Sequence, residues 1–188
     1  MKTNYWPSVS KPMSLAFASM MFFAACGGMR IADDESKEPI GVMIVGVHHL
    51  GPNFNISKFY INGYLAFNVG REGGGGSFVC CVELPRKWQP GMTAKVRWSV
   101  NDWSNAVMSE VDAGDYKSMV FENYEAVVPI EKYGEVGDLY AHFFSNGKVR
   151  LVSSSDPVQS SRHVIQHNDS RAADFATQGA KVLKQTGK

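Results

Sequence analysis

Apolar residues in the middle of the chain follow short runs and alternations that predict β-strands. Residues 40–47 form an almost continuous run of Ile, Val and Met, which is typical of a buried strand. Residues 93–99 alternate instead, so that Ala94, Val96 and Trp98 would share one face and basic residues the other. Further strands are predicted over residues 57–61, 64–69, 77–84, 119–130, 139–144 and 148–152.

Turn signals between these runs predict hairpins. Residues 62–63 are Asn-Gly, a pair that tolerates the positive φ needed at both positions of a tight hairpin turn. Residues 145–147, Ser-Asn-Gly, separate the last two strands in a similar way, and residues 90–91, Pro-Gly, suit a type II turn. About eight strands at hairpin spacing predict a mainly β fold, either an antiparallel β-sandwich or a small barrel.

The segments outside this pattern are less regular. Residues 101–118 lack a clear period and predict a long loop or irregular insert. The β domain is expected to span residues 40–155, followed by a polar tail over 156–188. Within the tail, residues 171–185 have helix-favouring composition, but Gly179 interrupts them. A marginal terminal helix or an unstructured tail is therefore expected.

The N-terminal residues resemble the signal of a bacterial lipoprotein. Two lysines and no acid precede a short apolar run that is well below the roughly 20 residues needed to span a bilayer. Ala24 and Ala25 then lead directly to Cys26. This is similar to the lipobox, although Phe23 stands where leucine is usual. We expect a signal peptide over residues 1–25, cleavage after Ala25 and lipid on the Cys26 thiol; an ordinary signal peptide that leaves Cys26 free is the alternative.

This prediction places the protein in the cell envelope. Residues 26–39 are polar and are expected to form a flexible tether between the lipid and the β domain. Gly27 follows the cysteine, where an aspartate would indicate retention in the inner membrane of a lipoprotein. The outer membrane, facing the periplasm, is therefore expected. Acyl chains on Cys26 would anchor the protein to the bilayer.

Charge does not indicate a nucleic-acid partner. The 188-residue chain has a formal net charge of +1, and removal of residues 1–25 takes away two lysines and no acid, which changes the net charge to −1. Such a balance provides no basic surface field of the kind that nucleic-acid binding requires.

Residues 73–76 are four consecutive glycines. A phosphate-binding loop would need a lysine and a following helix, whereas a strand is predicted to follow here. A close backbone approach or a bulge is the expected reason for the glycines.

Cys80 and Cys81 are adjacent within a predicted strand. With Cys26 lipidated, they are the remaining cysteines of a protein in an oxidising compartment. Neighbouring side chains of a regular strand point to opposite faces, and Cα atoms about 3.8 Å apart across a trans peptide are too close for a usual disulfide. Two separate thiols are thus favoured over a vicinal disulfide, which needs a distorted peptide that the nearby glycines could permit. The missing Cys-X-X-Cys spacing disfavours a redox-catalytic pair.

No combination of residues indicates an enzyme, a cofactor or a metal site. His163 and His167 are four residues apart, but the glutamate of a zinc-protease motif is absent between them, and no nucleophile elbow occurs. Structural or solvent-exposed roles are expected for the histidines, with one of the pair at 48–49 pointing inward and one outward. A hydrolase or redox enzyme that uses Cys80, Cys81 or His142 is a further hypothesis. The histidines are His48, His49, His142, His163 and His167.

Over residues 42–152 the chain resembles a family of small bacterial lipoproteins that form a domain of unknown function. The resemblance rests on the Asn-Gly turn and the motifs at residues 73–82 (Gly-Gly-Gly-Gly-Ser-Phe-Val-Cys-Cys-Val), 84–91, 96–98 and 137–150. Members often lie beside phospholipase effectors of type VI secretion systems. The resemblance thus implies a periplasmic immunity protein that neutralises a secreted lipase, and it implies no catalytic residues.

A binding or immunity lipoprotein is therefore the first functional hypothesis. Loop residues held by a scaffold often carry recognition, so Trp103, Asp112, Asp115 and Tyr116 are the expected partner contacts. A structural or ligand-binding envelope lipoprotein without a toxin partner is the alternative.

Overall fold

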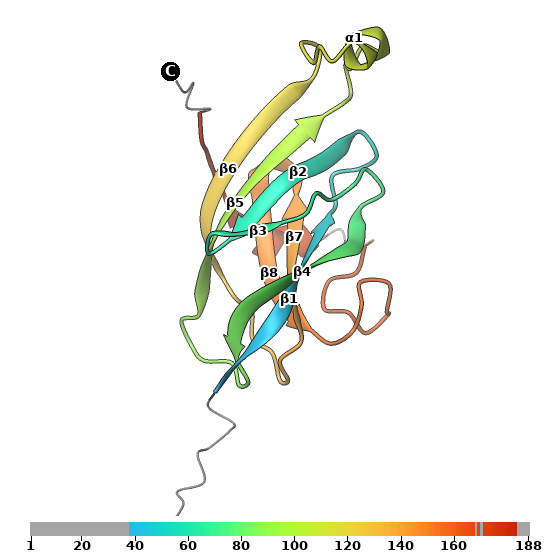
Figure 1. Ribbon diagram of the computed structural model, residues 1–188. Helices are drawn as coiled ribbons and strands as arrows, with labels where there is room; N and C mark the ends of the chain where they lie inside the picture. The colour runs from blue at the N-terminus through green and yellow to red at the C-terminus, as the bar shows by residue number, and fades with distance from the viewer. Residues whose placement is uncertain (1–37, 168, 170, 184–188) are drawn as a thin grey trace, which may run out of the picture. The chain divides into compact units, whose positions relative to one another are not determined.

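Two five-stranded β-sheets form the folded part of the chain (Figure 1). The computed structural model describes residues 38–167, 169 and 171–183. The chain separates into two units, Met1–Asp33 and Asp34–Lys188, and all described residues belong to the second. The expected signal peptide, Cys26 and most of the expected tether therefore lie outside the described residues.

The first sheet has the strand order β4-β1-β7-β8-β9. Its strands are β1 (Pro39–His48), β4 (Gly74–Pro85), β7 (Asp138–Phe144), β8 (Lys148–Ser154) and β9 (Thr177–Gln178). All neighbours are antiparallel except β1 and β7, which run parallel. The parallel pair departs from the expected antiparallel sheet. It places the apolar run of β1 inside the sheet, between β4 and β7, where both faces can be covered.

The second sheet has the order β10-β6-β5-β2-β3, and its strands pair antiparallel throughout. Its strands are β2 (Phe54–Ile61), β3 (Tyr64–Ala66), β5 (Thr93–Asp102), β6 (Val120–Pro129) and β10 (Ala180–Lys181). The short helices are α1 (Met108–Asp112) and the 3-10 helices η1 (Ser145–Gly147) and η2 (Ala172–Phe175). Since the two sheets pack face to face, the sandwich architecture predicted from the sequence is confirmed.

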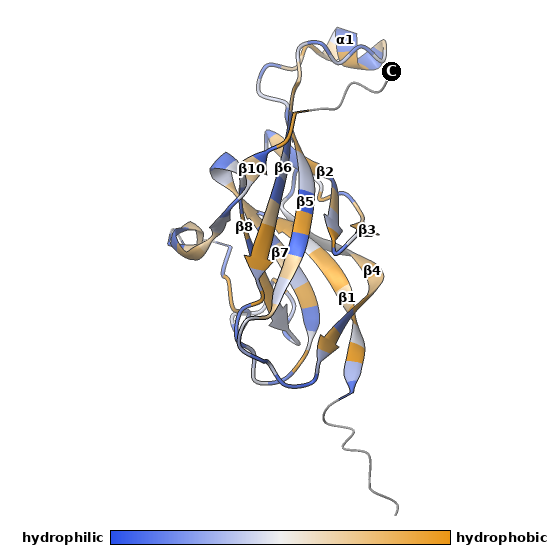
Figure 2. Ribbon diagram, turned by 90° about the vertical axis from the view of Figure 1, so that its left-hand side faces the viewer, coloured by the Kyte–Doolittle hydropathy of each residue, from blue (hydrophilic) through white to orange (hydrophobic). Residues whose placement is uncertain are grey.

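The main hydrophobic core lies between the two sheets. Phe143 of β7 is its centre, with ring centroids 5.2 Å from Phe59 and 5.7 Å from Trp98. The alternation predicted for β5 is confirmed, because Ala94, Val96 and Trp98 are buried while Lys95 and Arg97 are exposed. Figure 2 shows this alternation of apolar and polar positions along β5.

A smaller core covers the outer face of the first sheet. Residues 155–167, which we call the strap, follow β8 and cross this face, and Ile165 of the strap is fully buried. Beneath it lie Val45 and Val47 of β1 and Tyr140 of β7. The first sheet is therefore covered on both faces over its central strands, which explains the continuous apolar run of β1.

The predicted turns form as the glycine and asparagine signals indicate. Asn62 and Gly63 have φ values of 50° and 90° between β2 and β3, and Gly91 has a φ of 85°. Gly74 also has a positive φ, 91°, and a Cβ there would lie 2.6 Å from the carbonyl oxygen of Gly46. The register of β1 and β4 shifts beside this contact, so the expectation of a bulge and a close backbone approach is confirmed.

Two predicted segments differ from the structure. The helix expected over residues 171–185 does not form; the described part has η2 and then the short strands β9 and β10, which add to β8 and β6. Hydrogen bonding to the free backbone groups of β8 and β6 thus favours extended strands here over a helix of marginal stability. The irregular insert over residues 101–118 contains α1, and its first residues continue β5. Among the described residues, no helix has the length and apolarity needed to cross a membrane.

Candidate functional site

The connection between β5 and β6 projects from one end of the second sheet (Figure 1). We call residues 104–118 the tip. The two strands below it pair without interruption from Thr93 opposite Pro129 to Asp102 opposite Val120. None of the residues of α1 is buried. The tip is therefore a surface element carried by a continuous two-stranded ladder.

The structure separates Trp103 from the other predicted contact residues. Its backbone N–H donates to the Asn53 carbonyl oxygen at 2.8 Å, and its indole N–H donates to Asn55 Oδ1 at 2.6 Å. The Arg71 guanidinium lies 5.8 Å from the indole ring centroid. Trp103 thus fastens the base of the tip to the start of β2, and we assign it a structural part in holding the tip.

The other predicted contacts belong to the tip itself. Asp112 ends α1 and is exposed, and Tyr116 is 48% exposed. Asp115 is half-buried and pairs with Lys117 at 2.6 Å. Three of the four predicted residues therefore share one projecting segment.

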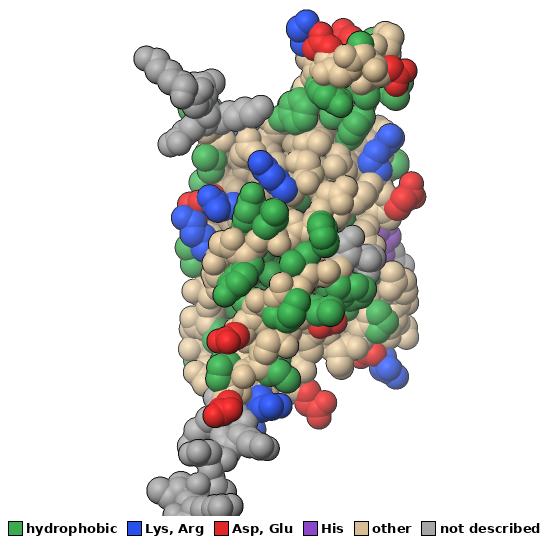
Figure 3. All heavy atoms as spheres, viewed as in Figure 1, with side chains coloured by type: hydrophobic (Ala, Val, Ile, Leu, Met, Phe, Trp, Pro, Cys, Tyr) green, Lys and Arg blue, Asp and Glu red, His purple; other side chains and the backbone are tan. Residues whose placement is uncertain are grey.

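Sequence reasoning missed the exposed apolar residues at the tip and at the start of β6 beside it. Val107 and Met108 at the start of α1 are 46% and 59% exposed, and Val120, where β6 begins, is 47% exposed. Acidic and basic side chains lie on the same projection (Figure 3). No sequence signal could have identified these apolar residues, because an apolar residue in an aperiodic segment can equally be buried.

All five histidines lie around one end of the first sheet. His48 ends β1 and His49 follows it, and His142 belongs to the adjacent parallel strand β7, where it is the register partner of Val47. The strap brings His163 and His167 to the same place. Sequence reasoning treated these residues separately, because neither the parallel pairing nor the path of the strap can be read from spacing.

Three of the imidazoles form a hydrogen-bonded series, which we call the relay. His49 Nε2 lies 2.9 Å from His142 Nδ1, and His142 Nε2 lies 3.1 Å from His163 Nε2. His163 Nδ1 lies 2.7 Å from the backbone oxygen of Asp156. His142 and His163 are buried, and His49 is half-buried.

The hydrogen bonds of the relay allow only one tautomer for each ring when all three rings are neutral. The Asp156 carbonyl can accept and cannot donate, so His163 donates from Nδ1 and must accept at Nε2. His142 then donates from Nε2 and accepts at Nδ1, and His49 donates from Nε2. In this neutral arrangement Nδ1 of His49 is left without a proton, and the hydrogen bonding of His49 to the His167 backbone favours adding a proton to that ring.

Burial keeps His49 and His142 neutral. Desolvation lowers the pKa of His49 to about 4, assisted by the charge of His167 and opposed by hydrogen bonding to the His167 backbone. Desolvation also lowers the pKa of His142 well below its ordinary value, with His49, His163 and Arg150 adding to the effect.

His48 lies outside the relay and has other partners. Its Nε2 donates to the Gly70 carbonyl oxygen at 2.7 Å, and its Nδ1 accepts the Leu50 N–H at 3.3 Å. Desolvation lowers the pKa of His48, although its bond to Gly70 opposes this. The expectation of one inward and one outward ring is therefore wrong for His49, because His48 is buried and His49 is half-buried with protein partners of its own. His48 clamps the turn before β4.

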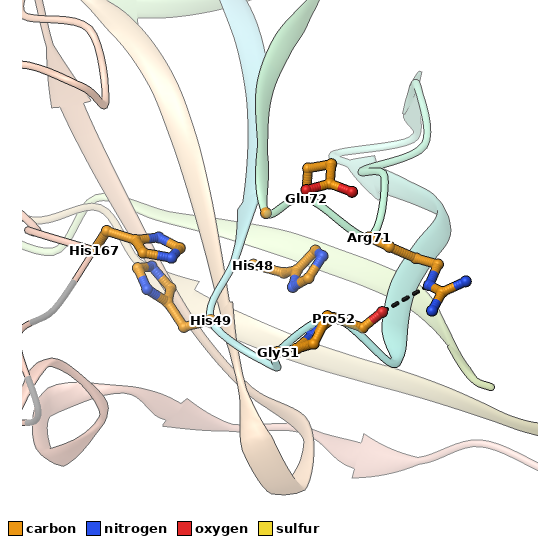
Figure 4. A pocket seen from close by; sticks show the side chains of 8 residues that line it. His48, His49, Gly51, Pro52, Arg71, Glu72 and His167 are labelled. Atoms are coloured by element: carbon orange, nitrogen blue, oxygen red, sulfur yellow. Dashed lines mark hydrogen bonds between the residues drawn. The ribbon is translucent and has the colours of Figure 1, made fainter. Parts of the chain in front are cut away.

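A hollow of about 370 Å³ opens beside the relay (Figure 4). The rings of His49 and His167 lie together on one side of it, with centroids 5.5 Å apart. The remaining lining residues are His48, Gly51, Pro52, Arg71, Glu72 and Gly73. A second hollow of about 350 Å³ lies against the same two rings and is also lined by Lys148 and Asp169. His49 therefore faces both hollows, from which its ring can receive a proton.

A family model described as a protein of unknown function, DUF3304, matches residues 52–151. The chain belongs to the DUF3304 family. The chain matches no curated protein and no solved structure. Membership confirms the resemblance to a domain of unknown function, whereas the lipoprotein signal and the link to type VI secretion stay predictions.

The segment shared with the DUF3304 family contains the adjacent cysteines. Cys80 and Cys81 form a disulfide across a cis peptide bond, with Cα atoms 3.1 Å apart. The expectation of two separate thiols differs from this arrangement, because it assumed a trans peptide in a regular strand. The register of β1 and β4 instead shifts here, and Cys80 is exposed and Cys81 half-buried. Within the described residues, no cluster of three His, Cys, Asp or Glu side chains suits a metal ion.

Proposed function

We propose that this DUF3304 protein is a lipid-anchored envelope protein that binds and neutralises a secreted lipase through its tip. The exposed apolar surface of the tip carries the proposal. Met108 and Tyr116 are exposed side chains of the tip, and no residue of α1 is buried. Asp112 supplies an exposed charge on the same segment. Interface anchors are typically apolar or aromatic side chains within a polar rim, which is the composition of this segment.

The scaffold below the tip favours binding without rearrangement. Ten consecutive residue pairs join β5 and β6 beneath it, and Trp103 fixes its base to Asn53 and Asn55. A surface that is ordered before binding loses less conformational entropy in the complex. An immunity protein that must occupy the active-site mouth of a lipase would benefit from such a projection.

The place of the N-terminal strand supports a role as an anchored protein. β1 begins at the end of the β domain opposite α1 (Figure 1). A lipid on Cys26 would be separated from Pro39 by a tether that reaches at most about 45 Å when extended. Such an anchor would hold the start of β1 towards the membrane and direct the tip away from it, to where a secreted enzyme arrives.

Co-expression with the lipase effector encoded beside the gene tests this proposal. The wild-type protein should restore growth and co-elute with the lipase, whereas Met108→Ser and Tyr116→Ser should each weaken binding by about tenfold or more. Leu65→Ser is the matched control, since Leu65 on β3 is an apolar side chain exposed to a similar extent outside the tip. Absence of both rescue and complex with the wild-type protein would contradict the proposal.

The hollow beside His49 favours ligand binding as a second candidate function. Two histidine rings and the opposite charges of Arg71 and Glu72 line a space that could hold a small polar molecule. Native mass spectrometry of the purified protein should then detect a bound small molecule, and His49→Ala should remove it. A ligand retained by that variant would place the binding elsewhere.

A further inference from the structure

We propose that the strap is a proton-operated cover: the neutral relay holds it on the first sheet, and acid releases it. The inference concerns residues that the tip does not use. It rests on the hydrogen bonds of His49, His142 and His163 and on what the strap covers.

The bond between His142 and His163 joins the middle of the strap to β7. It is buried and its nitrogen atoms lie 3.1 Å apart. Other side chains of the strap form hydrogen bonds within the strap. Arg162 binds Asp156 at 2.7 Å, and Gln166 donates to the His163 carbonyl oxygen at 2.7 Å. Loss of the histidine contact would therefore remove a polar tie between strap and sheet and leave the internal structure of the strap in place.

The relay has a fixed capacity for protons. A first extra proton can enter at Nδ1 of His49 without breaking a bond, because every internal link still contains one N–H and one lone pair. A second extra proton would leave two N–H groups facing each other at one of the two links. The closed relay thus holds at most one extra proton, whereas three separated imidazoles can hold three.

The charges around the relay oppose protonation in the closed state. Arg150 is the register partner of His142 across β7 and β8, and its charge disfavours a proton on both His142 and His49. Glu131 binds Arg150 through two contacts of 2.6 and 2.7 Å and so offsets part of this field. The titratable and charged groups that face the relay include Tyr140 from β7, His48 from β1, Arg150 and Lys148 from β8, His167 and Asp169 beside His49, and Asp156 and Arg162 within the strap.

Release would expose an apolar surface. Val45, Val47, Tyr140 and Val152 on the outer face of the first sheet are nearly or fully buried beneath the strap and η2. Val158 and Ile165 of the strap pack against them. The main core between the sheets does not depend on these contacts, so the strap can open while the sandwich persists.

The difference in capacity predicts a steep pH dependence. Opening takes up at least two more protons than the closed relay can hold once the free imidazoles are charged, so the open population should then rise by about 100-fold or more per unit of pH. A cover held by one ionisable contact would change by at most about tenfold per unit.

Amide hydrogen exchange of the full chain, corrected for intrinsic rates and followed by NMR from pH 7 to pH 4.5, tests this. Strap amides should lose protection steeply while those of β5 and β6 keep theirs. His163→Gln keeps a hydrogen-bonding side chain but removes one titrating ring, so the change per unit of pH should fall by a factor of about ten. His167→Gln is the control and should retain the wild-type slope, because His167 is not part of the relay.

Three outcomes would overturn the proposal. Wild-type strap protection could change by less than tenfold per pH unit, or His163→Gln could retain the full wild-type slope. Should that variant fail to fold, imidazole ¹⁵N shifts of the wild-type protein at pH 7 decide instead. They should show Nε2–H on His49 and His142 and Nδ1–H on His163; any other tautomer, or a charged His142, would contradict the relay.

Discussion

At the scale of single residues, Gly147 shows how one position satisfies two demands. The turn after β7 requires its positive φ of 67°, as the Ser-Asn-Gly signal predicts. The ring of Tyr124 from the other sheet also lies where a Cβ would be. The first demand is local and readable from the sequence, while the second comes from the packing of the two sheets.

We expect Gly147→Ala to destabilise the protein by about 2 kcal/mol or more, because alanine meets both the strained φ and the Tyr124 ring. Urea unfolding measures this change. Gly134→Ala is the control, since a Cβ at Gly134 has no atom within 4 Å. Its effect should lie within about 0.5 kcal/mol of zero, and equal losses for the two variants would exclude the contact with Tyr124 as the cause.

At the scale of elements, the ion pair of Arg150 joins three parts of the fold. Its side chain on β8 is 11% exposed, binds Glu131 after β6 in a bidentate arrangement, and donates to the Ala172 carbonyl oxygen of η2 at 3.0 Å. Removal of the carboxylate charge would leave a largely buried guanidinium without its counterion.

Glu131→Gln should therefore reduce the free energy of unfolding by about 2–4 kcal/mol. Glu125→Gln is the matched control, because the Lys95–Glu125 pair joins the neighbouring strands β5 and β6 but is 57% and 36% exposed. Exposed pairs contribute about 0–1 kcal/mol, so the control should change stability little. Chemical denaturation of both variants measures their free energies of unfolding. A loss below about 1 kcal/mol for Glu131→Gln would contradict the prediction and show that solvent can replace Glu131 as the partner of the Arg150 guanidinium.

At the scale of the whole molecule, buried histidines couple the stability of the fold to pH. The pKa values of His48, His49 and His142 are lowered in the folded state, chiefly by desolvation. Between about pH 6.5 and pH 4 the unfolded chain consequently binds more protons than the folded chain. Stability is thus highest above this window and falls as the pH decreases through it.

We expect a loss of about 3 kcal/mol in the free energy of unfolding between pH 7 and pH 5, after a reduction for the partial exposure of His49. Urea titrations at pH 7, 6 and 5 measure it. His142→Gln should show a smaller loss over the same range, because it lacks one of the buried titrating groups. A stability that stays constant over this range would contradict the lowered pKa values.

The proposed anchor also makes a prediction at this scale. The wild-type protein should fractionate with membranes and incorporate labelled palmitate, and Cys26→Ser should abolish both. Leu65→Ser serves as a control that leaves the N-terminal residues intact. Recovery of the wild-type protein free in solution, with an unmodified thiol at position 26, would refute the lipid anchor. The proposed location in the cell envelope would then lose its support.

Local patterns predicted most of the strands because their causes are local. The alternation of Ala94, Val96 and Trp98 reflects the two-residue repeat of a strand, and the turn at residues 62–63 reflects the φ preferences of asparagine and glycine. The short strands β9 and β10 were missed because edge pairing, and not their own composition, makes them extended. The tip was predicted as a loop, but its exposed apolar residues depend on its projection from the sheet.

The order of residues along the chain by itself determined the mainly β character, the turns and the membership of a family through residues 52–151. Each of these depends on neighbours within a few positions, where backbone geometry and side-chain preference act directly. Tertiary structure alone decided the relay, because His49, His142 and His163 meet only after β1 pairs in parallel with β7 and the strap folds back over both. Their chemistry follows from burial and mutual distance, and neither quantity exists before the sheets have packed.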